Sequence, residues 1–486
     1  MYHVEKINIK PKHKLFEFCD TVTNVSKNMY NVANFYIRNA MTGLSKETNQ
    51  RTSNETEVLR IVQDGINAHN EKALKKQTDQ KKAVLFEMPT KEHWFLNYYV
   101  LDAVFKESDN VDYRSHHAHI TQNSIKECVR AWKSYFELKK MFFSDSGSLT
   151  GGPKIPNYIK SDHKTVTLSN IACKIQNGLL RFPKCKEKLD VSIMPHFGDK
   201  LIEVRIVPYC GIYQIQIVTD DGVKNINDSL CNNVKDIPAE AGVAMLDHGI
   251  RNFATIADNK GNAPIIVKGE VLVSANQWYN KQMSRLRSIQ MQGHDPKVYH
   301  PPVTEQMNAL LRKRDAFLTD TFYKIAHFVF RTMTERNLSY LIVGKNTGWK
   351  QEVNIGHKNN QEFVNLPHAQ FISILHSVSR HYPIKVFEQD ESYTSKASFL
   401  DNDTMPETFK DAEIGEFSGK RLNRGLYRSG NGTLINADVN GAMNIGRKAN
   451  ERIFEAIKDF SYLTESISIC RFTDLNPSSI KNKSLA

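Results

Sequence analysis

Closely spaced cysteines are missing from this chain of 486 residues, which contains seven cysteines in all. They are scattered and odd in number, and no CxxC pair occurs. We therefore expect neither a disulfide framework nor a four-cysteine zinc site, and a reducing cytoplasm fits. Long apolar runs are also missing: no stretch approaches the roughly eighteen apolar residues of a membrane span. The opening "MYHVEKINIKPKHK" lacks the apolar segment of a secretory signal. The sequence predicts a cytoplasmic protein that makes no membrane contact.

Acidic residues are fewer than basic ones. The chain has 65 Lys and Arg against 53 Asp and Glu, a formal net charge of +12. A basic protein of this kind most often binds a polyanion, usually nucleic acid, although plain solubility also explains the charge. The length and a hydrophobic share of 40% allow roughly two to four domains with sizeable cores.

The first half of the chain combines an early strand with a helical stretch. Residues 2–10 alternate in a period of two and end at Pro11, which predicts a strand. Apolar residues then recur at helical spacing over 15–36, 93–106 and 123–143. Residues 43–82 are polar with weak periodicity, so we expect a helix–loop excursion there.

A segment rich in Ser, Gly and Pro, "FSDSGSLTGGPKIPNYIK", ends the helical stretch. Short alternating runs follow, which predict antiparallel strands of a small barrel or sheet. The first strand of the chain can join this sheet, with the helical region inserted into it. We therefore assign residues 1–10 and 150–240 to a small β-barrel and residues 11–149 to a helical region.

From Gly242 the pattern changes to alternating strands and helices. The runs "GVAMLD", "NFATIA", "YLIVG" and "PIKVFEQDE" predict strands, and amphipathic helices separate the later ones. This order is typical of an α/β domain with a partly parallel sheet. We assign residues 241–396 and 436–470 to that domain, 397–435 to an insert and 471–486 to a C-terminal tail.

Two aspartates stand at the ends of elements in this α/β part. Asp247 ends the strand "GVAMLD", where α/β folds place their sites, although Asp-His-Gly also suits a simple turn. Asp438 lies in "LINADVNGAMNIGRKA", before a helical run, where an aspartate often serves only as the helix N-cap. Gly441 and Ala442 are small and would let this helix start lie close to other backbone or to a ligand.

A third acidic position is Glu391 in "FEQDESYTSKASFL", with Glu388 and Asp390 close before it. Like charges crowded at a strand end are costly unless a cation shares them. Two divalent ions held by carboxylates are a standard means of phosphodiester hydrolysis. Oxygen ligands favour Mg²⁺, with Mn²⁺ also possible.

Four motifs occur in this order: "GVAMLDHGIRNFATI", "YLIVGKNTGWKQE", "ESYTSKASF" and "NADVNGAMNI". Together they closely resemble the RuvC-like nuclease domain of the TnpB family, the transposon-encoded, RNA-guided DNA endonucleases also labelled OrfB transposases and related to compact type V CRISPR effectors. "SKNMYN" and "GGPKIPNYIK" are similar to the N-terminal half of that family. The resemblance implies an RNase H-like (RuvC) α/β domain plus a helical recognition region inserted in a wedge-like β-barrel, a multidomain α+β protein. It also implies three catalytic and metal-binding acids, of which Asp247 matches the first and Asp438 the last.

The glutamate of the second motif should fall at Gly344, where it is missing. In some relatives with a rearranged site, the lost glutamate is replaced by one just before the "YTSK" motif, which here is Glu391. The strands "YLIVG" and "PIKVFEQDE" would be parallel neighbours about 5 Å apart, so a glutamate at the end of one can serve the other. We therefore expect Asp247, Glu391 and Asp438 to be the catalytic, metal-binding residues, with Glu388 as the alternative acid.

The sequence departs from the family pattern at a second place, after the "TSK" motif. Relatives often carry CxxC pairs of a zinc ribbon after "TSK", but Ser398 and Asp401 stand where the first pair would be, and residues 397–437 contain no cysteine. We expect no zinc. The insert keeps a basic run, "GKRLNRGLYRSGNG", that is either a solvated loop or a target-nucleic-acid contact. Its basic residues are Lys420, Arg421, Arg424 and Arg428, of which Arg428 is the expected phosphate ligand.

Other basic residues are candidates for lining a channel for an RNA–DNA heteroduplex, or else belong to solvated helix faces. They are Lys154 and Lys160 near Tyr158, Arg285 and Arg287 near Trp278, and Arg312, Lys313 and Arg314. Analogy with the family places recognition of a short duplex motif beside the target at Tyr30, Asn31 and Gln122.

The sequence thus predicts an RNA-guided, Mg²⁺-dependent DNA endonuclease with a guide RNA and a double-stranded DNA target as partners. Its oligomeric state is left open. Two alternatives remain. One is a nuclease-dead, RNA-guided DNA-binding repressor, which Gly344 favours, and the other is an accessory transposase protein.

Overall fold

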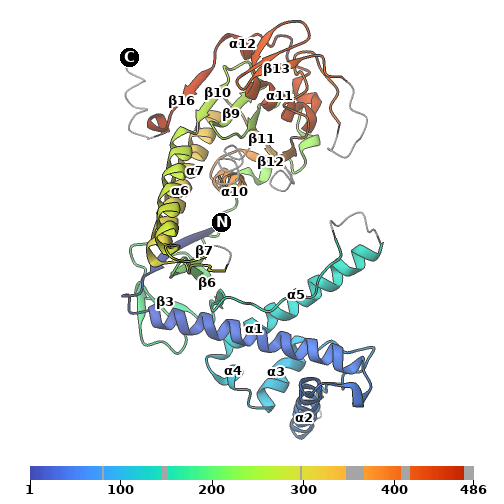
Figure 1. The fold of residues 1–486 in the computed structure, drawn as a ribbon. Coiled ribbons are helices and arrows are strands. Elements are labelled where there is room, and N and C mark those ends of the chain that lie inside the picture. The colour runs from blue at the N-terminus through green and yellow to red at the C-terminus, as the bar shows by residue number, and fades with distance from the viewer. Residues whose placement is uncertain are drawn as a thin grey trace. The chain divides into compact units, whose positions relative to one another are not determined.

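The computed structural model describes residues 1–78, 82–144, 151–196, 198–295, 298–345, 366–406 and 416–475. Two compact units divide the chain, Met1–Val223 and Lys224–Ala486, and Figure 1 shows their elements. The boundary expected at residue 240 is therefore wrong, because residues 224–240 belong to the second core. Ile237 is buried there, and Asn227 donates a hydrogen bond to the carbonyl oxygen of Ile384 at 2.8 Å. In the described part of the chain, no helix is both long enough and apolar enough to span a membrane.

The first unit contains an antiparallel sheet in the order β1-β7-β6-β2 and a smaller one in the order β3-β4-β5. The first strand pairs with β7 from Tyr2↔Asp220 to Ile9↔Tyr213, so the helical region is inserted between two strands of one sheet. Both sheets share one core, which contains Leu180 and Val204. Among the described residues the strands form two open sheets, in place of the closed barrel expected. The strands are β1 (Tyr2–Ile9), β2 (Val166–Ser169), β3 (Lys174–Gln176), β4 (Leu179–Arg181), β5 (Lys188–Asp190), β6 (Lys200–Tyr209) and β7 (Ile212–Asp220).

Helices of the first unit surround a second core that contains Met29, Val62, Leu101 and Trp132. They are α1 (Phe16–Leu44), α2 (Ser53–Lys75), α3 (Tyr98–Glu107), α4 (Val111–Arg114) and α5 (Ala118–Ser144). The helix expected from residue 93 begins only at Tyr98, because the Asn97 side chain accepts hydrogen bonds from the next backbone N–H groups and caps it.

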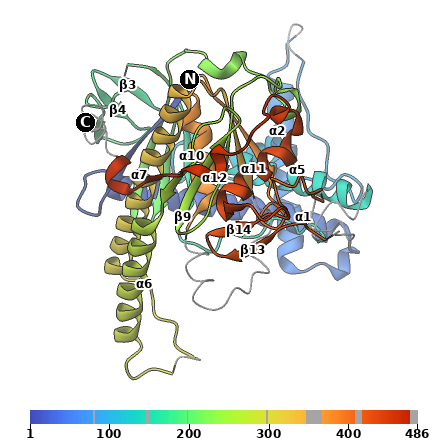
Figure 2. The same cartoon turned by 90° about the horizontal axis from the view of Figure 1, so that it is seen from above.

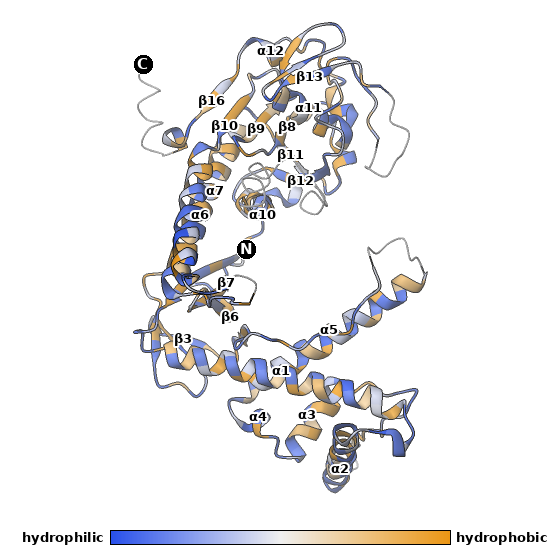
Figure 3. Cartoon of the chain, viewed as in Figure 1, coloured by the Kyte–Doolittle hydropathy of each residue, from blue (hydrophilic) through white to orange (hydrophobic). Residues whose placement is uncertain are grey.

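The second unit is built on a mixed sheet in the order β12-β11-β8-β9-β10-β16. Strands β12, β11 and β8 run parallel, which confirms the expected pairing of "YLIVG" with "PIKVFEQDE". A separate three-stranded sheet, β13-β14-β15, forms the insert. Figure 3 shows β8, β9 and β10 as hydrophobic, as expected for strands covered on both faces. The strands are β8 (Val243–Asp247), β9 (Asn252–Asp258), β10 (Ile265–Lys268), β11 (Tyr340–Lys345), β12 (Lys385–Asp390), β13 (Lys420–Asn423), β14 (Leu426–Arg428), β15 (Leu434–Asn436) and β16 (Ser468–Cys470).

Helices cover the two faces of the mixed sheet differently. On one face, Leu246 and Val343 share a core with α7 and α10, and on the other, Met245 and Ile342 share a core with α11. Helices α6 and α7 lie side by side along much of their length (Figures 1 and 2). The helices are α6 (Glu270–Gln290), α7 (Glu305–Glu335), α10 (His368–Ser379), α11 (Ala437–Ala449) and the short α12 (Tyr462–Glu465).

Candidate active site

Asp247 is the last residue of β8 and lies on the face of the sheet that α11 covers. Side chains alternate along a strand, so Asp247 shares this face with Val243 and Met245, both of which pack in the α11 core. A Cβ atom added to Gly441 would lie 2.8 Å from Asp247 Oδ2. The glycine therefore lets the helix backbone approach this carboxylate, as the small residue in the sequence predicted.

Asp438 lies in the first turn of α11 and does not cap it. The N-cap is Asn436, whose side-chain oxygen accepts hydrogen bonds from the backbone N–H groups of Asp438, at 3.0 Å, and Val439, at 3.2 Å. The Asp438 carboxylate is instead held by Asn252, which donates to Oδ2 at 2.7 Å, and by Arg421, which donates to Oδ1 at 3.4 Å. The capping interpretation left open by the sequence is wrong, and the carboxylate points to other partners.

Glu391 follows the end of β12 and lies beside Gly344. Its backbone N–H donates to the carbonyl oxygen of Lys345 at 3.3 Å, continuing the pairing of β11 with β12. A Cβ atom added to Gly344 would lie 2.6 Å from Glu391 Oε2 and 2.7 Å from Ile445 Cδ1. The Glu391 carboxylate thus fills the space that a side chain at position 344 would enter. Position 344 follows Val343, the partner of Leu246 in the neighbouring strand, and therefore lies next to Asp247.

The alternative acid, Glu388, points to the other face of the sheet. Its Oε2 lies 2.5 Å from Lys345 Nζ and its Oε1 lies 3.0 Å from His376 Nε2 on α10. Burial alone would raise the pKa of Glu388, but these two partners outweigh it and lower that pKa. Asp390 is bound in a similar way, to Lys448 at 3.2 Å and to Ser392. Among the three crowded acids, Glu391 is the one that the structure brings to Asp247.

Electrostatics at this edge of the sheet favour a cation. The pKa of Asp247 is raised well above its ordinary value, first by burial and then by the negative charges of Glu391 and Asp438, whereas Arg421 opposes the shift. Three carboxylates provide the hard oxygen ligands that suit Mg²⁺ or Mn²⁺. Within the described ranges, their oxygen atoms do not form a cluster with all separations under 4.8 Å. A pair of ions about 4 Å apart has its ligand oxygens spread more widely than a single ion does, so separations above 4.8 Å suit a two-ion site.

Three polar residues of α11 hold the loop that follows Glu391. Asn444 donates to the carbonyl oxygens of Thr394, at 2.9 Å, and Ala397, at 2.8 Å, and Asn440 donates to Ala397 at 2.8 Å. Arg447 donates to the carbonyl oxygens of Phe399 and Asp403. The sequence did not reveal this role of the asparagines, because the loop that they bind is some 40 to 50 residues away in the chain.

Lys268 was missed by the sequence analysis. Its Nζ donates to Asn252 Oδ1 at 2.8 Å, and this contact orients the amide that binds Asp438. Both residues lie on strands, and no local pattern marked them.

The insert brings one of its four basic residues to the carboxylates. That residue is Arg421, which bonds to Asp438, whereas the expected phosphate ligand Arg428 is exposed on the opposite face of the β-ribbon from buried Tyr427. Lys420 pairs in register with Arg428, and Arg424 is also exposed. A pocket of about 560 Å³ lies next to Arg421 and is lined by Ser395, Lys396, Glu416, Phe417, Gly419, Lys420 and Arg421.

Most of the other basic candidates lie on exposed surfaces, whereas Arg312 and Arg314 on α7 are half-buried and form ion pairs with Glu305 and Asp315. In the second unit, Arg285 and Arg287 are exposed on α6, and Lys313 on α7 stacks over the Trp278 ring at 5.2 Å. In the first unit, Lys154 and Lys160 are exposed in the segment that α1 binds.

The three residues proposed to read a duplex motif have internal partners instead. Asn31 exchanges two hydrogen bonds with the backbone of Ile159, at 2.9 and 3.0 Å. Gln122 donates to Asp102 and to the Tyr113 hydroxyl, and Tyr30 is buried. These contacts occupy both polar atoms of the Asn31 amide and the Nε2 group of Gln122, so the structure does not favour these residues as readers of base edges.

Comparison with known proteins finds a family model that matches part of the chain. Residues 230–350 match the family OrfB_IS605, described as "Probable transposase". This segment contains Asp247 and Gly344 and ends before Glu391 and Asp438. The match confirms the resemblance to OrfB-type, TnpB-like proteins that the motifs indicated. No curated protein is similar in sequence to the chain.

Three solved structures are similar over most of the chain. "Cryo-EM structure of the Cas12f1-sgRNA-target DNA complex" shares 13% identity, with 91% of this chain and 99% of that chain covered, at a TM-score of 0.29. "Cryo-EM structure of CRISPR-Cas12f Ternary Complex" shares 13% identity over 88% of this chain and 81% of that chain, at 0.29. C2c1 of Alicyclobacillus acidoterrestris in complex with single-guide RNA shares 11% identity, with 90% of this chain and 70% of that chain covered, at a TM-score of 0.28. At TM-scores this low, the superpositions carry no argument about function.

Proposed function

We propose that this chain belongs to the TnpB family and is an RNA-guided, metal-dependent DNA endonuclease with a single RuvC-like site. The observation that carries the proposal is the position of Glu391. Its carboxylate fills the space above Gly344, next to Asp247 and on the face of the sheet that is covered by α11, the helix that bears Asp438. The acid missing from the second motif is thereby supplied by the neighbouring strand.

Asp247, Glu391 and Asp438 would hold the metal ions, which we propose to be Mg²⁺. Two such ions, when bound, activate a water molecule and stabilise the leaving oxygen of a phosphodiester. Asn252 and Arg421 fix the orientation of Asp438 through its two oxygen atoms. Arg421 also lines the adjacent pocket, where a guanidinium suits a phosphate of the cleaved strand.

Guide RNA and double-stranded DNA are the proposed partners. The net charge of +12 and the basic insert support binding of a polyanion. In a guided nuclease, base pairing with the RNA supplies the sequence specificity, and the protein contacts the heteroduplex through its backbone shape. We propose that exposed Lys154, Arg285, Lys420, Arg424 and Arg428 contribute such backbone contacts.

We propose separate roles for the two units, nucleic-acid recognition for the first and cleavage for the second. We propose that the mixed sheet of the second unit with α11 is the RNase H-like nuclease domain, because its carboxylates gather at the ends of β8 and β12. In the first unit, the β1-β7-β6-β2 sheet would be the wedge, and the helices inserted in it would be the recognition region.

A nuclease-dead, RNA-guided repressor is the main competing function, and Gly344 is the feature that suggests it. Loss of an acid argues for inactivity only where nothing replaces it, and Glu391 occupies the space concerned. The accessory transposase role predicts strand-transfer products without added RNA.

The test is cleavage of a plasmid library by the purified protein with and without its co-purified RNA, in Mg²⁺ and in EDTA. Wild type is compared with Asp247→Ala. We expect double-strand cuts that require both RNA and Mg²⁺ and that the variant does not make. RNA-dependent DNA binding without cutting by wild type would establish the repressor, and joined DNA ends in the absence of RNA would establish the transposase.

A further inference from the structure

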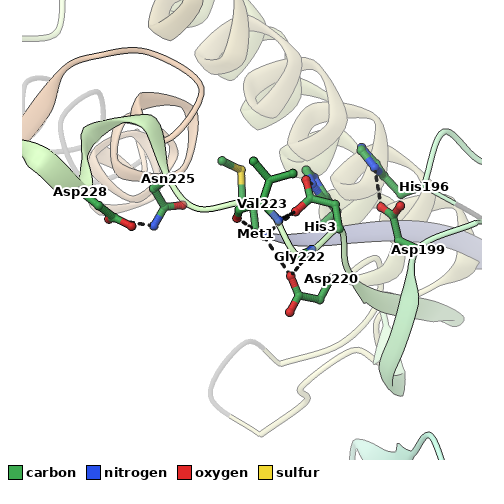
Figure 4. A network of polar contacts seen from close by, with 10 residues as sticks. Met1, His3, His196, Asp199, Asp220, Gly222, Val223, Asn225 and Asp228 are labelled. Carbon is green, nitrogen blue, oxygen red and sulfur yellow. Dashed lines mark hydrogen bonds and ion pairs between the residues drawn. The ribbon is translucent and has the colours of Figure 1, made fainter.

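Two histidines and an aspartate lie close together in the first unit. They are distant in sequence from the carboxylates described above. His3 lies on β1, and His196 and Asp199 lie in the loop between β5 and β6. One ligand atom from each of the three residues lies within 4.8 Å of the other two. Figure 4 shows His196 and Asp199 bonded to each other, with His3 beside them. The proposed nuclease function uses none of these residues.

Hydrogen bonds and stacking fix the two imidazole rings. His196 Nδ1 lies 3.0 Å from Asp199 Oδ2, and the rings of His3 and His196 are stacked with centroids 3.6 Å apart and planes 7° apart. His3 Nε2 lies 2.9 Å from Asp221 Oδ2. The Asp221 carboxylate on one ring nitrogen of His3 is the usual arrangement that orients a metal-binding histidine.

Strands position His3 and Asp221, whereas His196 and Asp199 lie on the loop before β6. His3 pairs with Thr219 in the β1–β7 register, and Asp221 follows the end of β7. The Asp221 carboxylate also accepts the backbone N–H of Val223 at 2.8 Å. The side chains are partly buried, with exposed fractions of 13% for His3, 33% for His196 and 25% for Asp199. An ion could therefore enter from solvent, and the stacked rings would tilt to turn their in-plane nitrogen lone pairs toward it.

We propose that His3, His196 and Asp199 form a zinc-binding site. Two imidazoles and one carboxylate are a typical three-residue Zn²⁺ ligand set, with the fourth tetrahedral position left to water. Mg²⁺ prefers oxygen ligands and would not compete well here. The bound ion links the first strand of the chain to the loop before β6 and so stabilises the sheet. The expectation of no zinc rested on missing cysteines in the insert, and this site uses no cysteine.

The test measures Zn²⁺ binding to the full-length protein after removal of metal with EDTA. An Asp247→Asn background and excess Mg²⁺ suppress binding at the nuclease carboxylates. Zn²⁺ affinity is measured by competition with a chromophoric chelator, and Co²⁺ absorption reports the coordination. We expect one Zn²⁺ per chain and a tetrahedral Co²⁺ spectrum. His196→Gln and Asp199→Asn should each weaken Zn²⁺ binding at least 100-fold.

His163→Gln is the matched control, because His163 Nε2 also lies near an aspartate, Asp20, at 3.7 Å, but outside the three-ligand cluster. This variant should bind Zn²⁺ as wild type does. If His196→Gln unfolds without metal, Asp199→Asn carries the test, since it keeps the shape of the side chain. Equal Zn²⁺ affinity in Asp199→Asn and His163→Gln, or no Zn²⁺ bound by wild type, would show a hydrogen-bonded cluster only and overturn the proposal.

Discussion

A single methyl group at position 344 should displace the acid that we place in the active site. In Gly344→Ala the new Cβ would lie 2.6 Å from Glu391 Oε2, whereas ordinary contact begins at 3.4 Å, so the carboxylate must move by 3.4 − 2.6 = 0.8 Å. A misplacement of about 1 Å can cost roughly 100-fold in rate. Overfilling of a core costs about 1–3 kcal/mol of stability. We expect single-turnover cleavage to fall by about 10- to 100-fold at saturating Mg²⁺.

Gly446→Ala separates the effect on the site from the effect on stability. Its Cβ would lie 2.5 Å from Met245 Cγ, which is as tight a contact as at Gly344 but does not involve a carboxylate. Thermal melting of both variants measures the cost of overfilling, and cleavage of one matched target measures the site. The reasoning would be refuted if Gly344→Ala cleaved at the wild-type rate, or if both variants lost cleavage equally.

Exchanging the residues at positions 391 and 344 tests whether lost cleavage can be rescued. Glu391→Gly removes the acid and should abolish cleavage. Adding Gly344→Glu places a glutamate in the space that Glu391 has vacated, with the Ile445 side chain as the remaining close neighbour at 2.7 Å. We expect the double variant to recover part of the activity that Glu391→Gly loses. A folded double variant with no more activity than Glu391→Gly would argue that strand β12 supplies more than the acid.

Further predictions concern the neighbouring residues. Gly441→Ala should lower cleavage by pressing on Asp247 Oδ2, while thermal stability stays near wild type because alanine favours the helix by about 1 kcal/mol. The raised pKa of Asp247 means that the folded protein retains a proton that the unfolded chain loses. The stability of the metal-free protein should therefore fall as the pH rises from the ordinary range of an aspartate toward the raised pKa. Mg²⁺ must displace this proton from Asp247, so the cleavage rate at limiting Mg²⁺ should increase with pH. Saturating Mg²⁺ should move the midpoint of this pH dependence to lower pH. A cleavage rate that does not change with pH at limiting Mg²⁺ would contradict the assignment of Asp247 as a metal ligand. Arg421→Ala should shift that midpoint upward and slow cleavage by roughly fivefold, whereas Arg428→Ala should do less. Asn444→Ala should lower the free energy of unfolding by about 2 kcal/mol in a denaturant titration, because it removes the side-chain donor to the buried Thr394 carbonyl and one of the two donors to Ala397.

The parallel pairing of β11 with β12 was predictable because both are short apolar runs separated by a helix. This pairing already places Glu391 near position 344. The role of Asp438 was not predictable from its place at a helix start, since an aspartate and an asparagine two residues apart compete for the cap and only the backbone geometry chooses Asn436. Three-residue strands such as β3 and β5 are too short to show the two-residue alternation of apolar and polar side chains that predicts a strand.

Long-range contacts account for most of what the sequence did not reveal. Asn252 and Asp438 are bonded across 186 residues, and His3 and His196 are stacked across 196 − 3 = 193 residues. Neither pair has a spacing that a motif could encode, because only the tertiary packing of a strand against a helix or a loop brings its members together. The choice of Arg421 over Arg428 likewise depends on which face of a β-ribbon each occupies.

The relocated acid is tested most directly by comparing Glu391→Gln with Glu388→Gln in single-turnover cleavage of one matched target at saturating Mg²⁺. The two changes are chemically identical and lie three positions apart, but Glu388 is paired with Lys345 and His376 on the opposite face. The account predicts that Glu391→Gln abolishes cleavage while RNA-dependent target binding persists, and that Glu388→Gln still cleaves. Full cleavage by Glu391→Gln, or its loss in Glu388→Gln alone, would contradict it.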